Sequence, residues 1–220
     1  MNYYTKRKIL NLFFPNRCPI CEEIINLNDR FCQDCTEKIT FYTGNLRIAG
    51  ASECFAAFEY NRAVIPAVHL LKNGSCGNSA YAFGACLADV LKNNDISSKI
   101  DIIIPVPLSE GSRRKRGYNQ SLLIAEAVGA EINKPVWCSV CKIRETKEQK
   151  TLSKAGRKLN LRNAFQVAEN ISGKRILLVD DITTTGSTLS EVAILLRKNG
   201  AKDVICSAVM KVEKRKQVHD

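Results

Sequence analysis

Histidine, aromatic residues and long apolar runs are scarce in this sequence. It has two histidines, one tryptophan and an aromatic content of 7%. His69 falls on an apolar helical face and His219 in a basic tail, so neither is predicted to act as a general base, and no catalytic residue is assigned. Apolar runs such as residues 102–108 are far shorter than the roughly 18 residues that a membrane-spanning helix needs. No membrane span is therefore predicted.

A recognisable export signal is also missing. Residues 6–14 start basic and turn apolar, but they run into Pro15 and a cysteine motif instead of a small-residue cleavage site. We expect a short amphipathic helix here and a protein of the reducing cytoplasm. In that compartment, ten cysteines are better explained as metal ligands and buried thiols than as disulfides.

Acidic residues are too few to balance the basic ones. The chain has 33 Lys and Arg residues against 22 Asp and Glu residues, a formal charge of +11. Such a surface attracts phosphate-rich partners, for example nucleic acid or a pyrophosphorylated small molecule. A merely soluble basic surface is the alternative that charge alone leaves open.

Length and composition suit one domain of ordinary size with a small module beside it. The 220 residues are 45% hydrophobic, as expected of a chain with a proper core. The alternation of short apolar stretches with helical ones predicts an α/β fold with a doubly wound, mostly parallel sheet and helices on both faces. Strands are predicted at 53–60, 100–104, 175–179 and 203–210, and helices at 63–71, 80–91, 119–131 and 187–198.

Four cysteines near the N-terminus form two closely spaced pairs. Cys18 and Cys21 make one CxxC turn, and Cys32 and Cys35 make a second after a gap of ten residues. Four thiolates complete a tetrahedral Zn²⁺ site with no open position, so the site is predicted to be structural. Two redox dithiols are the alternative. The predicted organisation is an N-terminal helix and zinc module (1–45), an α/β domain (46–212) and a basic tail (213–220).

The strongest chemical signal lies in residues 176–189, which read ILLVDDITTTGSTL. A buried strand is followed by Asp180 and Asp181, then by a hydroxyl- and glycine-rich turn that opens a helix. In an open α/β sheet, ligands bind at this carboxyl edge. The predicted phosphate-binding residues of the turn are Thr183, Thr184, Thr185, Gly186, Ser187 and Thr188.

This arrangement predicts a phosphorylated sugar as ligand. The helix N-terminus offers unpaired N–H groups and a positive dipole end, and Gly186 lets a phosphate approach the backbone. Carboxylates repel phosphate, so Asp180 and Asp181 make sense if they accept hydrogen bonds from sugar hydroxyls or hold the water shell of Mg²⁺. An N-capped helix with surplus Asp and Thr is the alternative, but it explains only one hydroxyl.

Two basic segments accompany this motif. Residues 113–116 read RRKR and follow the strand at 100–104, so the loop is expected near the same sheet edge, where its cations suit pyrophosphate. A solvated basic turn is the alternative. Residues 142–163 have no regular periodicity and hold eight Lys and Arg residues against two Glu residues. A loop of this length inside a compact domain is usually functional or mobile.

The remaining cysteines have no partners at ligand spacing. Cys138 and Cys141 form an isolated CxxC for which apolar strand packing is expected, with a redox or metal role as the alternative. The others stand alone in apolar or small-residue surroundings and are expected to be buried thiols. They are Cys54, Cys76, Cys86 and Cys206.

Taken together, these motifs resemble the ComF family of competence-associated phosphoribosyltransferase-like proteins. The acid pair with its threonine loop is similar to the ribose-phosphate signature of type I phosphoribosyltransferases. The match extends from about residue 18 to 209. The other segments that carry it are the double CxxC, the loop at 105–107 with Arg113, residues 116–120, residues 144–146 with Gln149, residues 152–153, Arg157 and Asn160.

The resemblance implies both a ligand and a biological setting. It implies a type I phosphoribosyltransferase fold that binds 5-phosphoribosyl 1-pyrophosphate, with Arg113 and Arg116 at the pyrophosphate and a zinc-ribbon-like module in front. It also implies a flexible hood at residues 142–163, in which Arg144, Lys154 and Arg157 are candidates for hood or nucleic-acid contacts. Family members are linked to handling incoming single-stranded DNA alongside a helicase-like ATPase.

Two function classes stay open on the sequence. One is an enzyme in which Mg²⁺ and the basic segments stabilise departing pyrophosphate. The other is a non-catalytic nucleic-acid-binding or ligand-sensing module that retains the phosphoribosyl site. No acceptor pocket and no convincing acid or base can be recognised, so the sequence does not choose between them.

Overall fold

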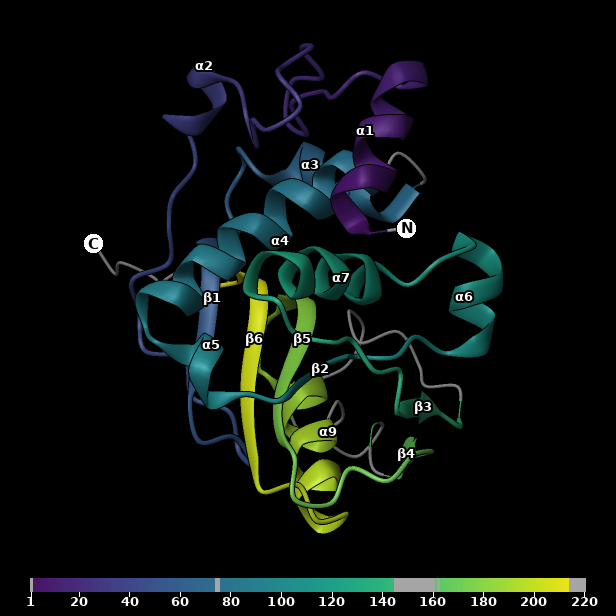
Figure 1. Ribbon diagram of the computed structural model, residues 1–220. Coiled ribbons are helices and arrows are strands. Elements are labelled where there is room, and N and C mark those ends of the chain that lie inside the picture. Colours follow the sequence, from purple (N-terminus) through teal and green to yellow (C-terminus); the bar gives the residue numbers. More distant parts are fainter. Residues whose placement is uncertain (1, 74–75, 145–160, 162, 214–220) are drawn as a thin grey trace, which may run out of the picture.

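The computed structural model describes residues 2–73, 76–144, 161 and 163–213. Helices and strands alternate as predicted (Figure 1). The elements are α1 (Tyr3–Phe13), α2 (Gln33–Thr36), β1 (Cys54–Glu59), α3 (Ile65–Asn73), α4 (Cys76–Asn93), α5 (Ile96–Lys99), β2 (Ile102–Pro105), α6 (Glu110–Arg116), α7 (Gln120–Ile132), β3 (Val140–Lys142), β4 (Phe165–Val167), β5 (Arg175–Thr183), α9 (Ser187–Lys198) and β6 (Asp203–Lys211).

The central sheet has four parallel strands in the order β1-β6-β5-β2. In the register, Leu178 of β5 is paired with Cys206 of β6, which is in turn paired with Cys54 of β1. A separate antiparallel pair joins β3 to β4. The predicted α/β class with a doubly wound, parallel sheet is confirmed.

Successive residues of β5 point into two different apolar cores. Leu177 and Val179 pack with α3, α4 and α7 on one face, whereas Ile176 and Leu178 pack with α9 on the other. This is the period-two alternation of a strand that is buried on both sides. Figure 1 shows the corresponding layers, with α4 and α7 in front of the strands and α9 behind them.

Helices α4 and α7 approach each other closely at Gly84. A Cβ atom at this position would lie 2.5 Å from the Cβ of Ala127 and 2.9 Å from the carbonyl oxygen of Ile124. Neither neighbour is the end of a flexible side chain, so any larger residue at position 84 has to push α7 outward. The absence of a side chain therefore sets the separation of the two helices.

The N-terminal segment packs on the outside of α4 and α7. Phe31 contacts the rings of Phe58 and Phe83 at centroid distances of 6.1 and 6.2 Å, and Arg30 forms an ion pair with Asp89 of α4. In α1, Tyr4 donates a hydrogen bond of 2.9 Å to Glu131 of α7. The expected short N-terminal helix is present. Within the described residues, no helix is both long and apolar enough to cross a membrane.

Two elements differ from the prediction near the carboxyl edge. Strand β5 does not end at Val179 but continues to Thr183, because β6 remains paired with it as far as Lys211. The predicted basic loop at residues 113–116 is part of a helix, α6. Ser109 caps its start by accepting a hydrogen bond from the backbone N–H of Ser112, and Gly117 ends it with a φ of +80°.

Candidate functional site

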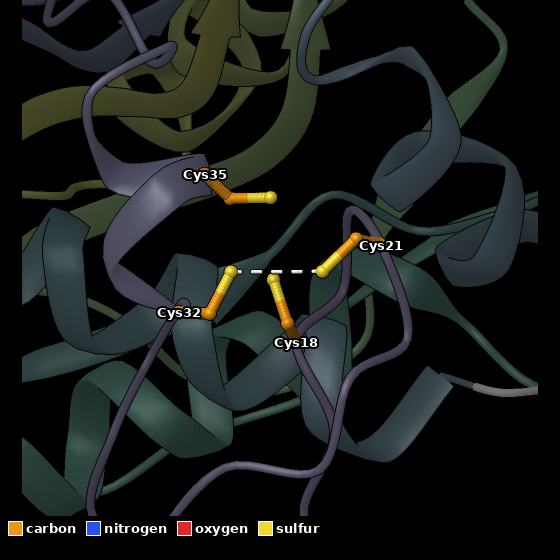
Figure 2. A group of neighbouring side chains, drawn as sticks. All are labelled: Cys18, Cys21, Cys32 and Cys35. Carbon is orange, nitrogen blue, oxygen red and sulfur yellow. Dashed lines mark hydrogen bonds between the residues drawn. The ribbon is translucent and has the colours of Figure 1, made fainter.

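The four N-terminal cysteines converge on one point. Figure 2 shows their side chains directed toward a common centre, and all four sulfur atoms lie within 4.8 Å of one another. Cys32 precedes α2 and Cys35 lies within it, while Cys18 and Cys21 come from the preceding turn. The sulfur atoms of Cys21 and Cys32 are 3.6 Å apart.

This geometry fits a tetrahedral zinc ion. With Zn–S bonds of about 2.3 Å, the sulfur atoms of a tetrahedral site lie about 3.8 Å apart, close to the separation found here. Cys18 and Cys35 are buried, whereas Cys21 is exposed. Four thiolates fill the coordination sphere, so the site suits a structural ion and leaves no position for a substrate.

The acid pair lies on β5, and its two members have different surroundings. Asp180 is buried, and its Oδ1 accepts hydrogen bonds from Ser121 Oγ at 3.0 Å and from the backbone N–H of Asp181 at 2.9 Å. Burial, reinforced by the charge of Asp181, raises the pKa of Asp180 well above its usual range. Asp181 is half-buried and therefore the more accessible carboxylate.

The loop after the acid pair leads directly to the start of α9. Gly186 is the N-cap residue in a left-handed conformation, with a φ of +74°, and no side chain caps the helix. The N–H groups of the first turn therefore have no side-chain acceptor at the cap position. The hydroxyls of Thr185 and Ser187 lie 2.7 Å apart. Such a helix end can hold a phosphate.

The end of β6 forms hydrogen bonds with the loop that follows the acid pair. The ammonium group of Lys211 donates hydrogen bonds to the carbonyl oxygen of Thr184 at 2.9 Å and to that of Val212 at 2.6 Å. The backbone N–H of Val212 donates to the carbonyl oxygen of Thr183 at 2.9 Å. The start of the loop is thus anchored to the end of β6.

Helix α6 carries the predicted pyrophosphate residues on a surface beside the sheet. Arg113 is exposed, and Arg116 is half-buried and donates a hydrogen bond of 3.2 Å to Gln120 Oε1. The bonds that connect this region to the acid pair run through the start of α7. Asn119 caps α7, donates from Nδ2 to the carbonyl oxygen of Val106 at 3.0 Å, and thereby fixes Ser121 beside Asp180.

Of the predicted hood residues, only Arg144 lies in the described part of the chain, where it is exposed and follows β3. Lys154 and Arg157 lie outside the described residues.

A protein-family model described as the phosphoribosyl transferase domain matches residues 85–220, which is more than half of the chain. The chain belongs to the phosphoribosyl transferase domain family. A second model, the double zinc ribbon domain, matches residues 9–46, which include the four clustered cysteines. This match and the sulfur geometry together support a structural zinc site.

Curated relatives of this chain include proteins named for competence and for DNA utilization. Competence protein F of Haemophilus influenzae is 39% identical over 108 residues, which cover 47% of each chain. DNA utilization protein YhgH of Escherichia coli (strain K12) is 41% identical over 106 residues, 47% of this chain and 46% of that one. The match thus spans about half the length of these relatives. Competence protein ComFC of Bacillus subtilis is 25% identical over 198 residues, 90% of this chain and 78% of that one.

These relatives confirm the resemblance to competence-associated phosphoribosyltransferase-like proteins. Among solved structures, adenine phosphoribosyltransferase of Saccharomyces cerevisiae aligns with 67% of this chain and 73% of its own, at 17% identity and a TM-score of 0.41.

Sequence reasoning missed two residues that support the acid pair and its loop in this phosphoribosyl transferase domain. Ser121 has no motif of its own, although its place just after the capping residue Asn119 puts it at the start of a helix. Lys211 lies at the end of the last predicted strand, and only the pairing of β6 with β5 brings it to Thr184. Neither interaction leaves a local pattern in the sequence.

Three expectations about other residues are wrong. Cys138 and Cys141 are exposed rather than packed in an apolar strand. Cys138 precedes β3, and in β3 the neighbouring Val140, not Cys141, packs into the core. His69 is exposed on α3 rather than on an apolar face. Cys54 is half-buried rather than buried, since β1 is an edge strand.

The other isolated cysteines and the second histidine divide between described and undescribed residues. Cys86 and Cys206 are buried as predicted. The side chain of Cys76 and the whole of His219 lie outside the described residues.

Proposed function

We propose that this chain binds 5-phosphoribosyl 1-pyrophosphate together with Mg²⁺ and acts in the handling of incoming single-stranded DNA during natural competence. One observation carries the first part of this proposal. At the carboxyl edge of a parallel sheet, an acid pair is followed within a few residues by a hydroxyl-rich loop and a helix start that no side chain caps. The family membership supports the same ligand class.

In this proposal, the loop and the acid pair bind different parts of the ligand. The 5′-phosphate lies at the N-terminus of α9, where N–H groups and the hydroxyls of residues 183–188 donate hydrogen bonds. Asp181 accepts hydrogen bonds from the ribose hydroxyls. Carboxylate and hydroxyl oxygens are ligands that Mg²⁺ accepts, and the ion would offset the charge of the ligand's phosphates. Asp180, the more deeply buried member, orients the pair from beneath.

The proposed pyrophosphate contacts come from Arg113 and Arg116 on α6. Arginine presents several N–H donors in a planar fork, which suits phosphate oxygens. The capping of α7 by Asn119 connects α6 to the acid pair through hydrogen bonds.

The proposal also includes the domain limits at residues 45 and 212 and a cytoplasmic setting.

The proposed role in DNA handling rests on charge and on the relatives. The names Competence protein F and DNA utilization protein YhgH link two relatives to competence and to DNA utilization. The excess of basic residues supports a polyanion partner. We propose that α6 and the segment with Arg144, Lys154 and Arg157 contact single-stranded DNA, and that a helicase-like ATPase acts alongside the protein.

Calorimetric titration with 5-phosphoribosyl 1-pyrophosphate tests the ligand site. Asp181→Asn removes an acceptor for two hydroxyl groups and should weaken binding by about 1 to 3 kcal/mol, since those donors lose their partner. Omitting Mg²⁺ should weaken binding as well; a chelator is unsuitable because it would also remove zinc. Glu37→Gln, which removes the same charge from an exposed site in the zinc module, is the matched control. Equal affinity for wild type and Asp181→Asn would overturn the proposal.

A non-catalytic nucleic-acid-binding or ligand-sensing module is the second candidate function. The observation that favours it is the exposure of Arg113, Arg114 and Lys115 on α6, since cations open to solvent suit a long polyanion as well as a small one. Release of pyrophosphate, measured with nucleobases and with single-stranded DNA as acceptors, separates the candidates. Ligand binding without any release would favour the module, whereas turnover would establish an enzyme.

A further inference from the structure

A groove runs between the N-terminal helix and α7, apart from the proposed sugar site. It encloses about 650 Å³ and is lined by residues of α1, the zinc module, α4 and α7. Its apolar walls include Leu10, Phe14 and Leu123. Its cations are Lys6, Arg7 and Arg17, against a single acidic side chain, Glu126. The groove thus combines apolar surface with a net positive charge.

The positive charge of this region is not neutralised by acids from its own segment. Residues 1–21 contain Lys6, Arg7, Lys8 and Arg17 but no Asp or Glu. Two of these cations are held in place by uncharged partners. Arg7 donates a hydrogen bond of 2.8 Å to the carbonyl oxygen of Leu27 and lies 3.2 Å above the Tyr81 ring. Arg17 donates one of 2.9 Å to the carbonyl oxygen of Glu22. Their charge remains available to an anion.

Two exposed aromatic rings follow Lys6 and Arg7 at the end of this helix, and the second of them, Phe14, lines the same groove. Phe13 and Phe14 are 74% and 72% exposed, at the end of α1 and just after it. A phenylalanine at this exposure gains little from the fold, because most of its surface stays in water. Flat rings next to lysine and arginine are the arrangement with which proteins bind single-stranded nucleic acid, where bases stack on the rings and phosphates face the cations.

The shape of the site also favours this class of partner over a lipid surface. A helix that lies on a bilayer separates its apolar face from its charged face. Here the cations Lys6 and Arg17 line the same concave groove as Phe14 and Leu123. The groove reaches Leu123, one helical turn from Asn119, at which the basic helix α6 connects to α7. In Figure 1, α6 lies beyond the start of α7 and α1 lies over α7.

We propose that this groove is a second binding site for single-stranded nucleic acid, with a base stacked on Phe14 and phosphates held by Lys6 and Arg17. This second site extends the proposed DNA function to the face formed by α1 and α7, and the inference rests on that proposed function. The occupant is a few nucleotides of a strand that can also contact α6.

A binding titration of the zinc-loaded, full-length protein with a fluorescent single-stranded oligonucleotide tests the groove. Phe14→Leu keeps an apolar side chain but removes the ring, and should weaken binding about fivefold or more, the lower end of the contribution of one stacked base. Lys6→Glu should weaken binding and make the log–log salt slope shallower by about 0.7 for each phosphate that the variant no longer neutralises. Leu12→Ala, on the same helix and 80% exposed but not part of the groove lining, is the apolar control. Lys198→Glu, exposed on α9, is the charge control.

A second probe keeps the test decisive if a variant is unstable. Wild type should bind an abasic oligonucleotide of the same length less tightly than the base-containing one, and Phe14→Leu should reduce this difference. Equal affinity of wild type for the two oligonucleotides would overturn the stacking role of Phe14.

The outcomes separate this inference from the proposed function. If Lys115→Glu on α6 weakens binding but Lys6→Glu and Phe14→Leu do not, the groove inference fails and the DNA function stands. If wild type binds no oligonucleotide at physiological salt, both fail, whereas the binding of 5-phosphoribosyl 1-pyrophosphate is tested separately. Wild-type binding to vesicles of anionic phospholipid that Leu12→Ala abolishes, together with unchanged oligonucleotide binding by Phe14→Leu, would identify a lipid surface instead.

Discussion

The zinc module and the α/β domain maintain their structures by different means. Helix α1 has no buried residue, and the four-residue α2 has only Cys35. The sheet, in contrast, lies between two large apolar clusters that contain most of the residues of β5 and β6. A module with so little apolar burial depends on metal–thiolate bonds, whereas the domain depends on the removal of apolar surface from water. Stability in the two regions should therefore respond to different changes.

The largest expected effect is the loss of zinc from the module. Cys32→Ser removes one of four thiolates, and the metal of such small sites contributes about 10 to 16 kcal/mol of apparent binding energy to the folded state. Elemental analysis should find about one zinc per wild-type chain and much less in the variant. Hydrogen exchange should show faster exchange in the module and retained protection in β5 and β6. Full zinc occupancy in Cys32→Ser would contradict the assignment of the site.

A cavity in the apolar core of the α/β domain should destabilise that domain and leave the zinc module intact. Leu177→Ala removes a fully buried side chain of β5 and should lower the free energy of unfolding by about 2 to 5 kcal/mol, as measured in denaturant. Its zinc content should remain that of wild type. Leu12→Ala, at an exposed position, should change stability by less than about 0.5 kcal/mol. A loss of zinc from folded Leu177→Ala would show that the two regions are not independent.

A smaller effect, with the opposite sign, is expected at the acid pair. The pKa of Asp180 is raised in the folded state, so the folded protein binds the proton more tightly than the unfolded chain. The associated stability is present at low pH and is lost as pH rises through the folded pKa. Asp180→Asn, which cannot ionise, should raise the melting temperature at neutral pH by about 2 °C or more.

Two further measurements accompany the Asp180→Asn prediction. The melting temperature of the variant should depend less on pH than that of wild type, and the variant should bind the sugar donor more weakly. Destabilisation at neutral pH would show that Asp180 is ionised and well paired in the folded protein.

The smallest effect is expected at an ion pair at the base of the sheet. Arg175 donates hydrogen bonds to Asp101, including one of 2.6 Å from Nη2, and this lowers the pKa of Asp101 from 3.8 to about 2. A depressed pKa contributes stability that is present above the unfolded value and is lost as pH falls toward 2. Both side chains are partly exposed, so water screens the pair.

A pH series of thermal melts measures this contribution. Asp101→Asn should melt slightly below wild type at neutral pH, and the difference should shrink as the solution becomes more acidic. A difference that grew on acidification would contradict the assigned direction of the pKa shift.

Much of the fold could be predicted from the sequence because its signals are local. The strand predicted at residues 203–210 nearly coincides with β6, and the strand predicted at 175–179 begins with β5 but ends four residues before it. The two CxxC pairs predicted the cysteine cluster, because all four cysteines lie in one short segment of the chain. The helix at 187–198 was predicted with the observed limits, because the glycine-rich turn and the amphipathic pattern agree.

The features that could not be predicted depend on contacts between segments that are distant in the sequence. The different surroundings of Asp180 and Asp181 depend on Ser121 of α7, 59 residues before Asp180. The exposure of Cys141 follows from the packing of the neighbouring Val140 against the core, which no pattern in residues 138–142 indicates. The groove beneath α1 forms only where that helix meets α7. Helix α6 could have been predicted, because Ser109 and Gly117 are an ordinary start and end for a helix.

The close approach of α4 and α7 at Gly84 has a consequence for genetics. A mutation there would shift α7 and, with it, Ser121 and the orientation of Asp180, although residue 84 contacts neither. A screen for loss of function should therefore recover substitutions at position 84 beside those in the acid pair. Ala127→Gly should suppress such a mutation only in part, because the carbonyl oxygen of Ile124 would still lie 2.9 Å from the added Cβ. Mutations that impair the site should thus include some at residues that do not contact the ligand.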